Sequence, residues 1–311
     1  MREEKQTREL SANKYNVGVF KLITIASMLQ LPVVAHANGA PAPGWRTTVT
    51  AGYAVQGDSD LENRGEFSVD RSILQVETAR RFGQKLFAGG SISYGESRYS
   101  FSASAFSAPW EDIRNVQFGL SLRYLASEKW SLFGFPILSY RTERDADLSE
   151  GREYGLIAGA SYRFSETLSL GPGIGAFSGI GDEEDYFPIL LINWKMTDTL
   201  SLETGRGLAI SRGPGLSLKW QPANQWTFGI AARYEKSRFR LDDEAGNIGE
   251  DKSVPVLLTA RWEPNRKFTL SALAGVETSA TLTLEDNSGN RLDQLSYDSA
   301  PIAGLVAAFK F

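Results

Sequence analysis

The chain has 311 residues, a formal net charge of −4, 42% hydrophobic residues and no cysteine. The absence of cysteine excludes disulfides, Cys-ligated clusters and thiolate catalysis. The chain also lacks a basic tract of the kind that nucleic-acid-binding proteins carry. Beyond the N-terminal segment no apolar run reaches the roughly 18 residues of a membrane helix, which argues against a helical membrane protein.

The N-terminal segment has the features of a secretion signal. Residues 1–21 are polar and basic, residues 22–29 are mostly apolar, and Ala35 and Ala37 give the small-x-small pattern of a cleavage site. We therefore expect a cleaved signal peptide at residues 1–37 and a mature chain that begins at Asn38. A short buried helix is the alternative. Cleavage would also remove His36, the only histidine in the sequence.

From Trp45 onward, apolar and polar residues alternate in blocks of about ten, which predicts a series of strands. A repeated motif marks every second break: an aromatic residue, a polar turn, and a large apolar residue six positions further on. A tight hairpin would return both anchor residues to the same face of neighbouring strands. The motif therefore predicts an aromatic girdle at one membrane interface. Its members are Tyr124, Trp130, Tyr162, Trp194, Trp220, Trp226, Trp262 and Phe268.

The strands are apolar on the face that carries these aromatic residues and small or polar on the other. In residues 116–124, for example, Phe118, Leu120 and Leu122 alternate with Gly119 and Ser121. A soluble β-sandwich is the alternative, but it would need polar outer faces. The pattern instead predicts strands whose apolar face contacts lipid.

Longer polar segments separate the short turns. They fall at residues 56–66, 97–111, 142–151, 179–185, 205–213, 236–251 and 285–298. Alternating short and long connections are typical of an outer-membrane barrel with periplasmic turns and extracellular loops. We predict an all-β fold: a single transmembrane antiparallel β-barrel over residues 38–311, with about 14 strands and both termini in the periplasm. Twelve strands is the alternative, because residues 200–220 are short and glycine-rich.

Two strands stand out. The strand at residues 130–140 places Phe133, Phe135 and Ile137 at inner-face positions, which indicates an interior filled by side chains at that point. The last eleven residues alternate cleanly and end with Phe309 and Phe311 on the apolar face. They resemble the closing strand of bacterial outer-membrane barrels. This class commonly ends in an aromatic residue that the barrel-assembly machinery reads.

Catalysis and metal binding find little support in the residue types. A mature chain without histidine or cysteine lacks the general base and the thiolate that barrel enzymes would need. Acidic segments at residues 182–185, 242–244 and 286–290 could bind Ca²⁺ by ligand type, but the twelve-residue calcium-loop pattern is missing. We therefore predict no enzyme activity, no metal site and no cofactor.

Each strand that runs toward a short turn, and the closing strand, ends in a cation at an inner-face position. These candidates for a lumenal basic ring are Arg81, Arg123, Arg163, Lys195, Lys219, Arg261 and Lys310. Rings of Lys and Arg favour anions in pores. The alternative is that the seven cations pair with interior glutamates or snorkel to the interface.

Several short elements resemble a Gram-negative family of outer-membrane barrels that carries only a domain-of-unknown-function label. They are W-E-D at residues 110–112 running into the strand at 116–125, W-S-L at 130–132, R-F-R-L at 238–241 and P-I-A-G at 301–304. The resemblance spans residues 45–311. It implies the barrel fold and the outer membrane of a Gram-negative cell, and it brings no substrate and no catalytic residue.

The function expected from these features is that of a passive, porin-like channel for small solutes. A structural or surface-interaction barrel with a filled lumen is the alternative, and an outer-membrane enzyme is a distant third. The expected partners are outer-membrane lipid, lipopolysaccharide and the barrel-assembly machinery, with no nucleic acid. We expect a monomer.

Overall fold

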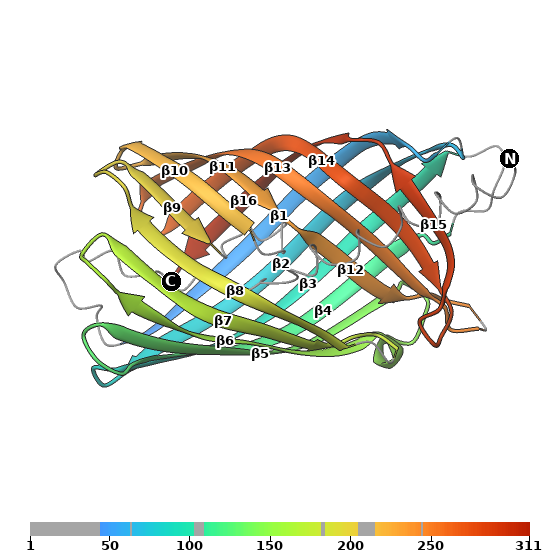
Figure 1. Ribbon diagram of the computed structural model, residues 1–311. Helices are drawn as coiled ribbons and strands as arrows, with labels where there is room; N and C mark the ends of the chain where they lie inside the picture. Colours follow the sequence, from blue (N-terminus) through green and yellow to red (C-terminus); the bar gives the residue numbers. More distant parts are fainter. Residues whose placement is uncertain (1–43, 63, 103–108, 182–183, 205–214, 244) are drawn as a thin grey trace, which may run out of the picture.

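The computed structural model describes residues 44–311, except positions 63, 103–108, 182–183, 205–214 and 244 (Figure 1). The predicted signal peptide, its cleavage site at Ala35 and Ala37, and the mature start at Asn38 lie outside the described residues. In the part of the chain that is described, no helix is long and apolar enough to cross a membrane.

The described elements are strands and one short 3₁₀ helix. In chain order they are β1 (Trp45–Asp60), β2 (Glu66–Phe82), β3 (Leu86–Ser102), β4 (Asp112–Leu125), β5 (Trp130–Glu143), η1 (Leu148–Gly151), β6 (Arg152–Arg163), β7 (Leu168–Ser178), β8 (Glu184–Lys195), β9 (Leu200–Thr204), β10 (Gly215–Ala223), β11 (Trp226–Arg233), β12 (Glu235–Arg240), β13 (Ile248–Asn265), β14 (Phe268–Glu285), β15 (Arg291–Tyr297) and β16 (Ala300–Lys310).

These segments form a closed antiparallel barrel of 14 strands. Two of the barrel strands are each broken into two segments, because β13 pairs first with β12 and then with β11, and β14 pairs with β15 and then with β16. The ring closes where β16 pairs with β1, from Thr48 opposite Lys310 to Gln56 opposite Ile302. The prediction of about fourteen strands is confirmed, and the twelve-strand alternative is wrong.

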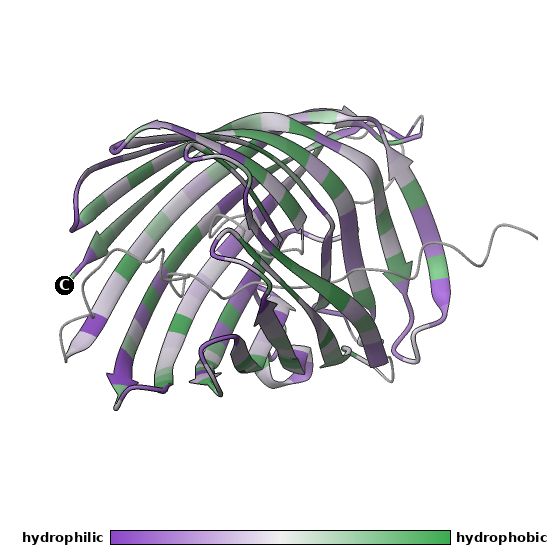
Figure 2. Ribbon diagram, turned by 60° about the vertical axis from the view of Figure 1, so that its left-hand side comes forward, coloured by the Kyte–Doolittle hydropathy of each residue, from purple (hydrophilic) through white to green (hydrophobic). Residues whose placement is uncertain are grey.

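The outer face of the barrel is an apolar belt. Leu120, Leu190 and Leu258 expose 58%, 62% and 62% of their surface, and aromatic and aliphatic side chains on neighbouring strands are exposed beside them. Figure 2 shows the alternation of apolar and polar residues along the strands that produces this belt. A soluble protein does not leave so continuous an apolar surface in water. The strands therefore contact lipid, and the β-sandwich alternative does not hold.

The strands are longer at one end than the sequence pattern indicated. Two stretches read as loops, residues 236–251 and 285–298, contain β12, the start of β13, and β15. Their polar residues pair across strands, as where Lys236 lies opposite Lys252 and Thr283 opposite Gln294. The apolar side chains of these segments, such as Phe239 and Tyr297, are buried inside the barrel. The segments therefore lack the apolar outer face that marks the lipid-facing strands, although the backbone pairing is the same. We call this end the loop end and the opposite one the short-turn end.

Close packing between strands makes a specific prediction at Gly275 in β14. A Cβ atom there would lie 2.0 Å from the backbone oxygen of Val256, whereas one at Gly90 in β3 would meet nothing closer than 3.7 Å. We expect Gly275→Ala to lower the free energy of unfolding by about 1–3 kcal/mol, because backbone atoms must shift. The matched control Gly90→Ala should leave it unchanged or raise it slightly. Urea unfolding in lipid vesicles measures both, and equal effects would contradict this account of the packing.

Candidate functional site: the barrel interior and its closed end

One sector of the inner wall is apolar. Phe135, Ile137, Ile157, Phe177 and Phe187 form a buried cluster on the inner faces of β5, β6, β7 and β8, with Phe133 and Ile189 packed against it. Glycines make this possible. The Phe177 and Phe187 rings lie within 2.2 Å and 2.0 Å of where the Cβ atoms of Gly155 and Gly175 would stand. The three apolar inner residues of β5, which broke the sequence pattern, therefore belong to a cluster that continues over three further strands.

The neighbouring sector, on β1 to β5, is polar at mid-height. Its buried uncharged inner side chains are Thr50, Ser93, Asn115, Gln117 and Ser139. It also carries charge, because Arg141 of β5 lies 3.4 Å from Glu153 of β6. They share the inner face because they stand opposite one another across the strand pairs, for example Ser93 opposite Gln117 and Gln117 opposite Ser139. The interior is thus lined by two chemically different walls.

At the loop end the barrel narrows. β12 follows β11 in the chain but does not continue along the same line. It reaches β5 instead, where Arg240 forms a parallel bridge with Thr142. On the other side Leu61, just after β1, bridges to Tyr297 of β15. β1 to β5 and β12 to β15 therefore form a smaller ring that leaves out β6 to β11. The position of β12 across the interior is visible in Figure 1.

An apolar cluster fills this smaller ring, and we call it the loop-end cluster. Its buried members are Leu61, Phe67, Val69, Tyr99, Trp110, Ile113, Phe239, Leu241, Ala280, Leu282, Leu295 and Tyr297. Trp110 is 2% exposed, and its ring meets that of Phe239 edge to face at 5.0 Å. Phe67 meets Tyr297 in the same way at 4.7 Å. Such packing leaves no open path through this part of the described structure.

A buried ionic layer lies next to the loop-end cluster. Arg71 of β2 donates hydrogen bonds to Glu277 at 3.1 Å and to Gln56 at 3.0 Å, and it lies 3.5 Å from Asp251. The hydroxyls of Tyr99 and Tyr297 donate to Asp251 at 2.7 and 3.1 Å. Residues from β1, β2, β3, β13, β14 and β15 thus meet at one point. Buried charges persist only where partners of this kind satisfy them.

Further ion pairs hold β12 in position. The ammonium of Lys236 lies 3.0 Å from Asp185 of β8 and 3.5 Å from Glu250 of β13. Arg238 donates to Glu285 at the end of β14. These contacts tie the strand that crosses the interior to three neighbouring elements. The closed end is therefore held by ion pairs as well as by apolar packing.

The η1 helix lies beside this closed end, in contact with β5 and β12. The backbone N–H and the hydroxyl of Ser149 donate to Asp147, which caps the helix. These hydrogen bonds hold the pKa of the Asp147 carboxyl below its usual value. At the same end Arg144 donates to Glu96, and that hydrogen bond raises the pKa of the Arg144 guanidinium.

The predicted aromatic girdle lies together at the short-turn end. Trp130 stacks edge to face on Tyr162 at 4.9 Å, Trp226 lies 6.2 Å from Trp262, and Trp262 meets Phe268 at 6.4 Å. Tyr124, Trp194 and Trp220 are exposed on the same outer face. Phe268 also contacts Phe309 of the closing strand at 4.9 Å. Phe311 is exposed, and its role as an insertion signal stays a prediction.

Four of the seven predicted ring cations contact carboxylates. Lys219 lies 2.8 Å from Glu203, Lys195 lies 2.9 Å from Asp198, and Arg261 and Lys310 lie 2.8 and 3.6 Å from Glu263. Arg81 donates to the backbone oxygen of Gln84, Arg123 donates to the hydroxyl of Ser131, and Arg163 stands opposite Ser169. The pairing alternative thus describes part of the set. Anion selectivity stays a prediction.

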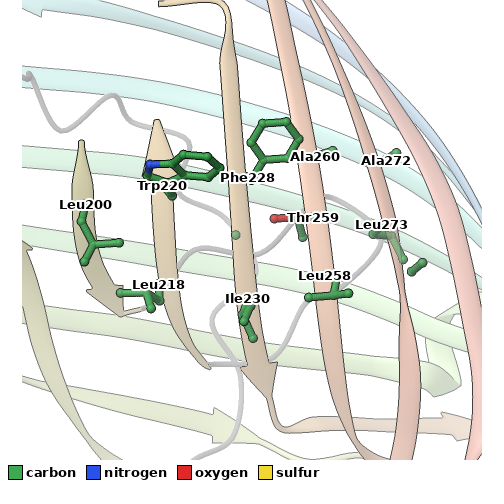
Figure 3. Close-up of a pocket in the computed structure, with 12 residues that line it drawn as sticks. Leu200, Leu218, Trp220, Phe228, Ile230, Leu258, Thr259, Ala260, Ala272 and Leu273 are labelled. Atoms are coloured by element: carbon green, nitrogen blue, oxygen red, sulfur yellow. The ribbon is translucent and has the colours of Figure 1, made fainter. Parts of the chain in front are cut away.

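An outward-facing hollow of about 520 Å³ lies over β9, β10, β11, β13 and β14. Figure 3 shows the side chains that line it, among them Leu218, Trp220, Phe228, Ile230 and Leu258. All five belong to the exposed outer belt. The mouth of the hollow therefore faces lipid. Among the described residues, no group of three or more metal-ligating side chains lies together.

The ionic layer and the loop-end cluster were not found from the sequence. Arg71 and Asp251 are 180 residues apart, and residues 236–251 were read as a loop. The only available signal was a pair of opposite charges at inner-face positions, which does not specify a partner. In the sequence, Trp110 is notable only as part of a family resemblance.

No known family model matches the sequence, and no curated protein matches it significantly. Solved outer-membrane barrels are similar in structure. A FadL homologue from Pseudomonas aeruginosa superposes with a TM-score of 0.50 at 11% identity, covering 85% of this chain and 90% of its own. An outer membrane channel from Pseudomonas putida F1 gives 0.49 at 12% identity, with coverage of 87% and 97%. The toluene transporter TodX of P. putida gives 0.47 at 8%, with coverage of 88% and 91%. The likeness to the FadL homologue bears out the barrel fold.

The ionic layer leads to a prediction about stability. Asp251→Ala removes the shared partner of Arg71 and of two buried tyrosine hydroxyls. We expect a loss of about 3–5 kcal/mol in the free energy of unfolding, as for other buried ion pairs that lose one member. Arg64→Ala is the matched control, because Arg64 pairs with Asp293 where both side chains are nearly half exposed. It should cost less than about 1 kcal/mol. Equal losses in vesicle unfolding would contradict the role given to the ionic layer.

Proposed function

We propose that the protein is an outer-membrane channel for small solutes whose loop end is closed in the conformation described. The passage is passive and porin-like in that solutes diffuse through the lumen without a catalytic step. The short turns and both termini of the chain face the periplasm, the loop end faces outward, and the barrel works as a monomer. Lipid and lipopolysaccharide surround it, and the assembly machinery inserts it through the C-terminal strand.

One observation carries the channel proposal. Inner side chains are buried at mid-height and at the loop end, whereas inner residues near the short turns, such as Arg81, Arg123, Phe133 and Arg163, remain half-buried. A barrel with a purely structural role would need no accessible, charged inner wall at one end. The likeness in fold to a FadL homologue agrees with this proposal without carrying it.

The closed end favours the second candidate, a structural or surface-interaction barrel. The loop-end cluster and the ionic layer together fill the smaller ring. The two candidates differ in what the closure does. In a channel the closure opens, and in a structural barrel it is permanent.

Conductance in planar lipid bilayers separates these candidates. We expect the wild type to conduct in rare, discrete steps. The double variant Trp110→Ala/Phe239→Ala removes two rings from the centre of the loop-end cluster. It should be open for most of each recording, since each truncation costs the closed state about 3–5 kcal/mol. Leu120→Ala, on the lipid-facing surface, is the control and should behave as wild type.

Two outcomes would count against the channel. If the double variant folds and yet neither it nor the wild type conducts, the structural barrel is the better account. If the wild type shows large, permanently open pores, the closed loop end has been given the wrong role. Circular dichroism of each variant establishes that the barrel has formed.

A further inference from the structure

The ionic layer at the loop end holds more carboxyl groups than guanidinium groups. Arg71 lies 3.1 Å from Glu277 and 3.5 Å from Asp251, so two carboxyls share one cation. The other hydrogen-bonding groups of the layer, the two tyrosine hydroxyls and the Gln56 amide, are neutral. With both carboxyls ionised, the layer would therefore carry a net single negative charge.

This excess charge would be buried. Glu277 is 3% exposed and Asp251 is 6% exposed. A further acid, Glu235 of β12, acts on Glu277 with a charge of the same sign. A buried charge without a counterion is costly, and two carboxyls that share a site avoid that cost when one of them binds a proton. The layer is neutral when one of its two carboxyls is protonated.

The hydrogen bonds indicate which carboxyl holds the proton. Asp251 accepts from the hydroxyls of Tyr99 and Tyr297 at 2.7 and 3.1 Å, and donors of this kind favour the ionised form. Oε1 of Glu277 accepts from Arg71, but Oε2 is buried and has no hydrogen-bond partner in the part of the chain that the structure describes. An unpartnered anionic oxygen costs more than an unpartnered neutral hydroxyl. The proton therefore belongs on Glu277.

The layer exists only while the loop end is closed. Arg71, Asp251 and Glu277 come from β2, β13 and β14, which meet within the smaller ring. If the ring opened and water reached the layer, Glu277 would become an ordinary glutamic acid, which is ionised at neutral pH. Closing the loop end would thus take up a proton, and opening would release it.

We propose that Glu277 is a proton-binding site of the closed loop end, so that acid holds the channel closed and a rise in pH favours opening. The direction follows from linkage, because raising the pH favours whichever state binds fewer protons. The part of this inference that concerns opening rests on the proposed function. The protonation of Glu277 concerns the closed barrel alone.

Infrared spectroscopy of the full-length barrel, folded in lipid vesicles, tests the protonation without requiring transport. At about pH 6 an ordinary glutamic acid, whose pKa is about 4.3, is almost fully ionised. The difference spectrum between wild type and Glu277→Gln at that pH should contain the carbonyl band of a protonated carboxyl. Glu263→Gln is the matched control, because Glu263 contacts two cations, Arg261 and Lys310, at the short-turn end. Its difference spectrum should lack the band.

Stability gives a second readout of the same charge. The amide of Glu277→Gln has the shape of a protonated carboxyl and can still accept from Arg71. The variant should therefore fold and resist urea as well as wild type does. An ionised Glu277 would instead make this variant lose stability in the way expected for Asp251→Ala.

Conductance in planar bilayers tests the effect on opening. Wild-type openings should be more frequent at about pH 8 than at about pH 6, rising by at most about tenfold per pH unit, the limit for release of one proton. Glu277→Gln cannot release that proton, so it should open as rarely at the higher pH as at the lower. Glu263→Gln should keep the wild-type dependence.

Four results would overturn the inference. They are a missing band in the Glu277→Gln difference spectrum, a large loss of stability in that variant, wild-type openings that do not increase with pH, and an increase that survives Glu277→Gln. Failure of the proposed function is distinguishable from these. A barrel that shows the band and never conducts would remove the channel and keep the proton site. A barrel that conducts without the band would keep the channel and remove the site.

Discussion

The backbone of a strand in hydrocarbon must find every hydrogen-bond partner within the protein, and this requirement shapes the whole structure. An open sheet would leave two edges unpaired in lipid. The pairing of β1 with β16 removes both edges, and it joins the first described strand to the last. Closure then forces alternate side chains into the lumen. The outer belt and the inner wall are two consequences of the same pairing.

Closure of the barrel also leaves a lumen, and the loop end fills part of it. Beyond the membrane the strands no longer need one common ring, and the barrel divides. The smaller ring contains β1 to β5 and β12 to β15, joined where β12 meets β5 and where Leu61 meets β15. The strands β6 to β11 end before this ring begins. The smaller ring is narrow enough for side chains to fill, as in other barrels of low strand number. Its interior holds aromatic rings and the ionic layer around Arg71.

The barrel fold can be predicted from the sequence because the pattern of lipid-facing residues is visible within each strand. Residues such as Leu120, Tyr154 and Leu258 can be placed outside from their own strand, and the short turns fix which strands are neighbours. The closing of the loop end is not local. The bridge between Arg240 and Thr142 joins segments almost a hundred residues apart, and nothing in either segment specifies the other.

The inner wall was predictable only in part, for a related reason. Inner-face position follows from alternation, so the placement of Arg81 or Arg123 on the lumen side needs no partner. Whether an inner cation contacts a glutamate depends on how far along the barrel axis each of the two residues lies. That position is set by the register of every hairpin between their strands. Lys219 meets Glu203 from the neighbouring strand, while Arg71 meets Asp251 and Glu277 from across the ring. The alternation of inner and outer positions alone does not tell which carboxylate an inner cation will contact.

The energetics of the ionic layer also limit how the proposed channel would open. Separating a buried, hydrogen-bonded ion pair costs about 3–5 kcal/mol when one partner is lost. If opening exposed Arg71 and Asp251 to water, water would offset part of that cost, and the loop-end cluster would add its own. A net difference of about 4 kcal/mol corresponds to an open population of roughly one in a thousand. A ligand shifts that population only if it binds the open state more tightly.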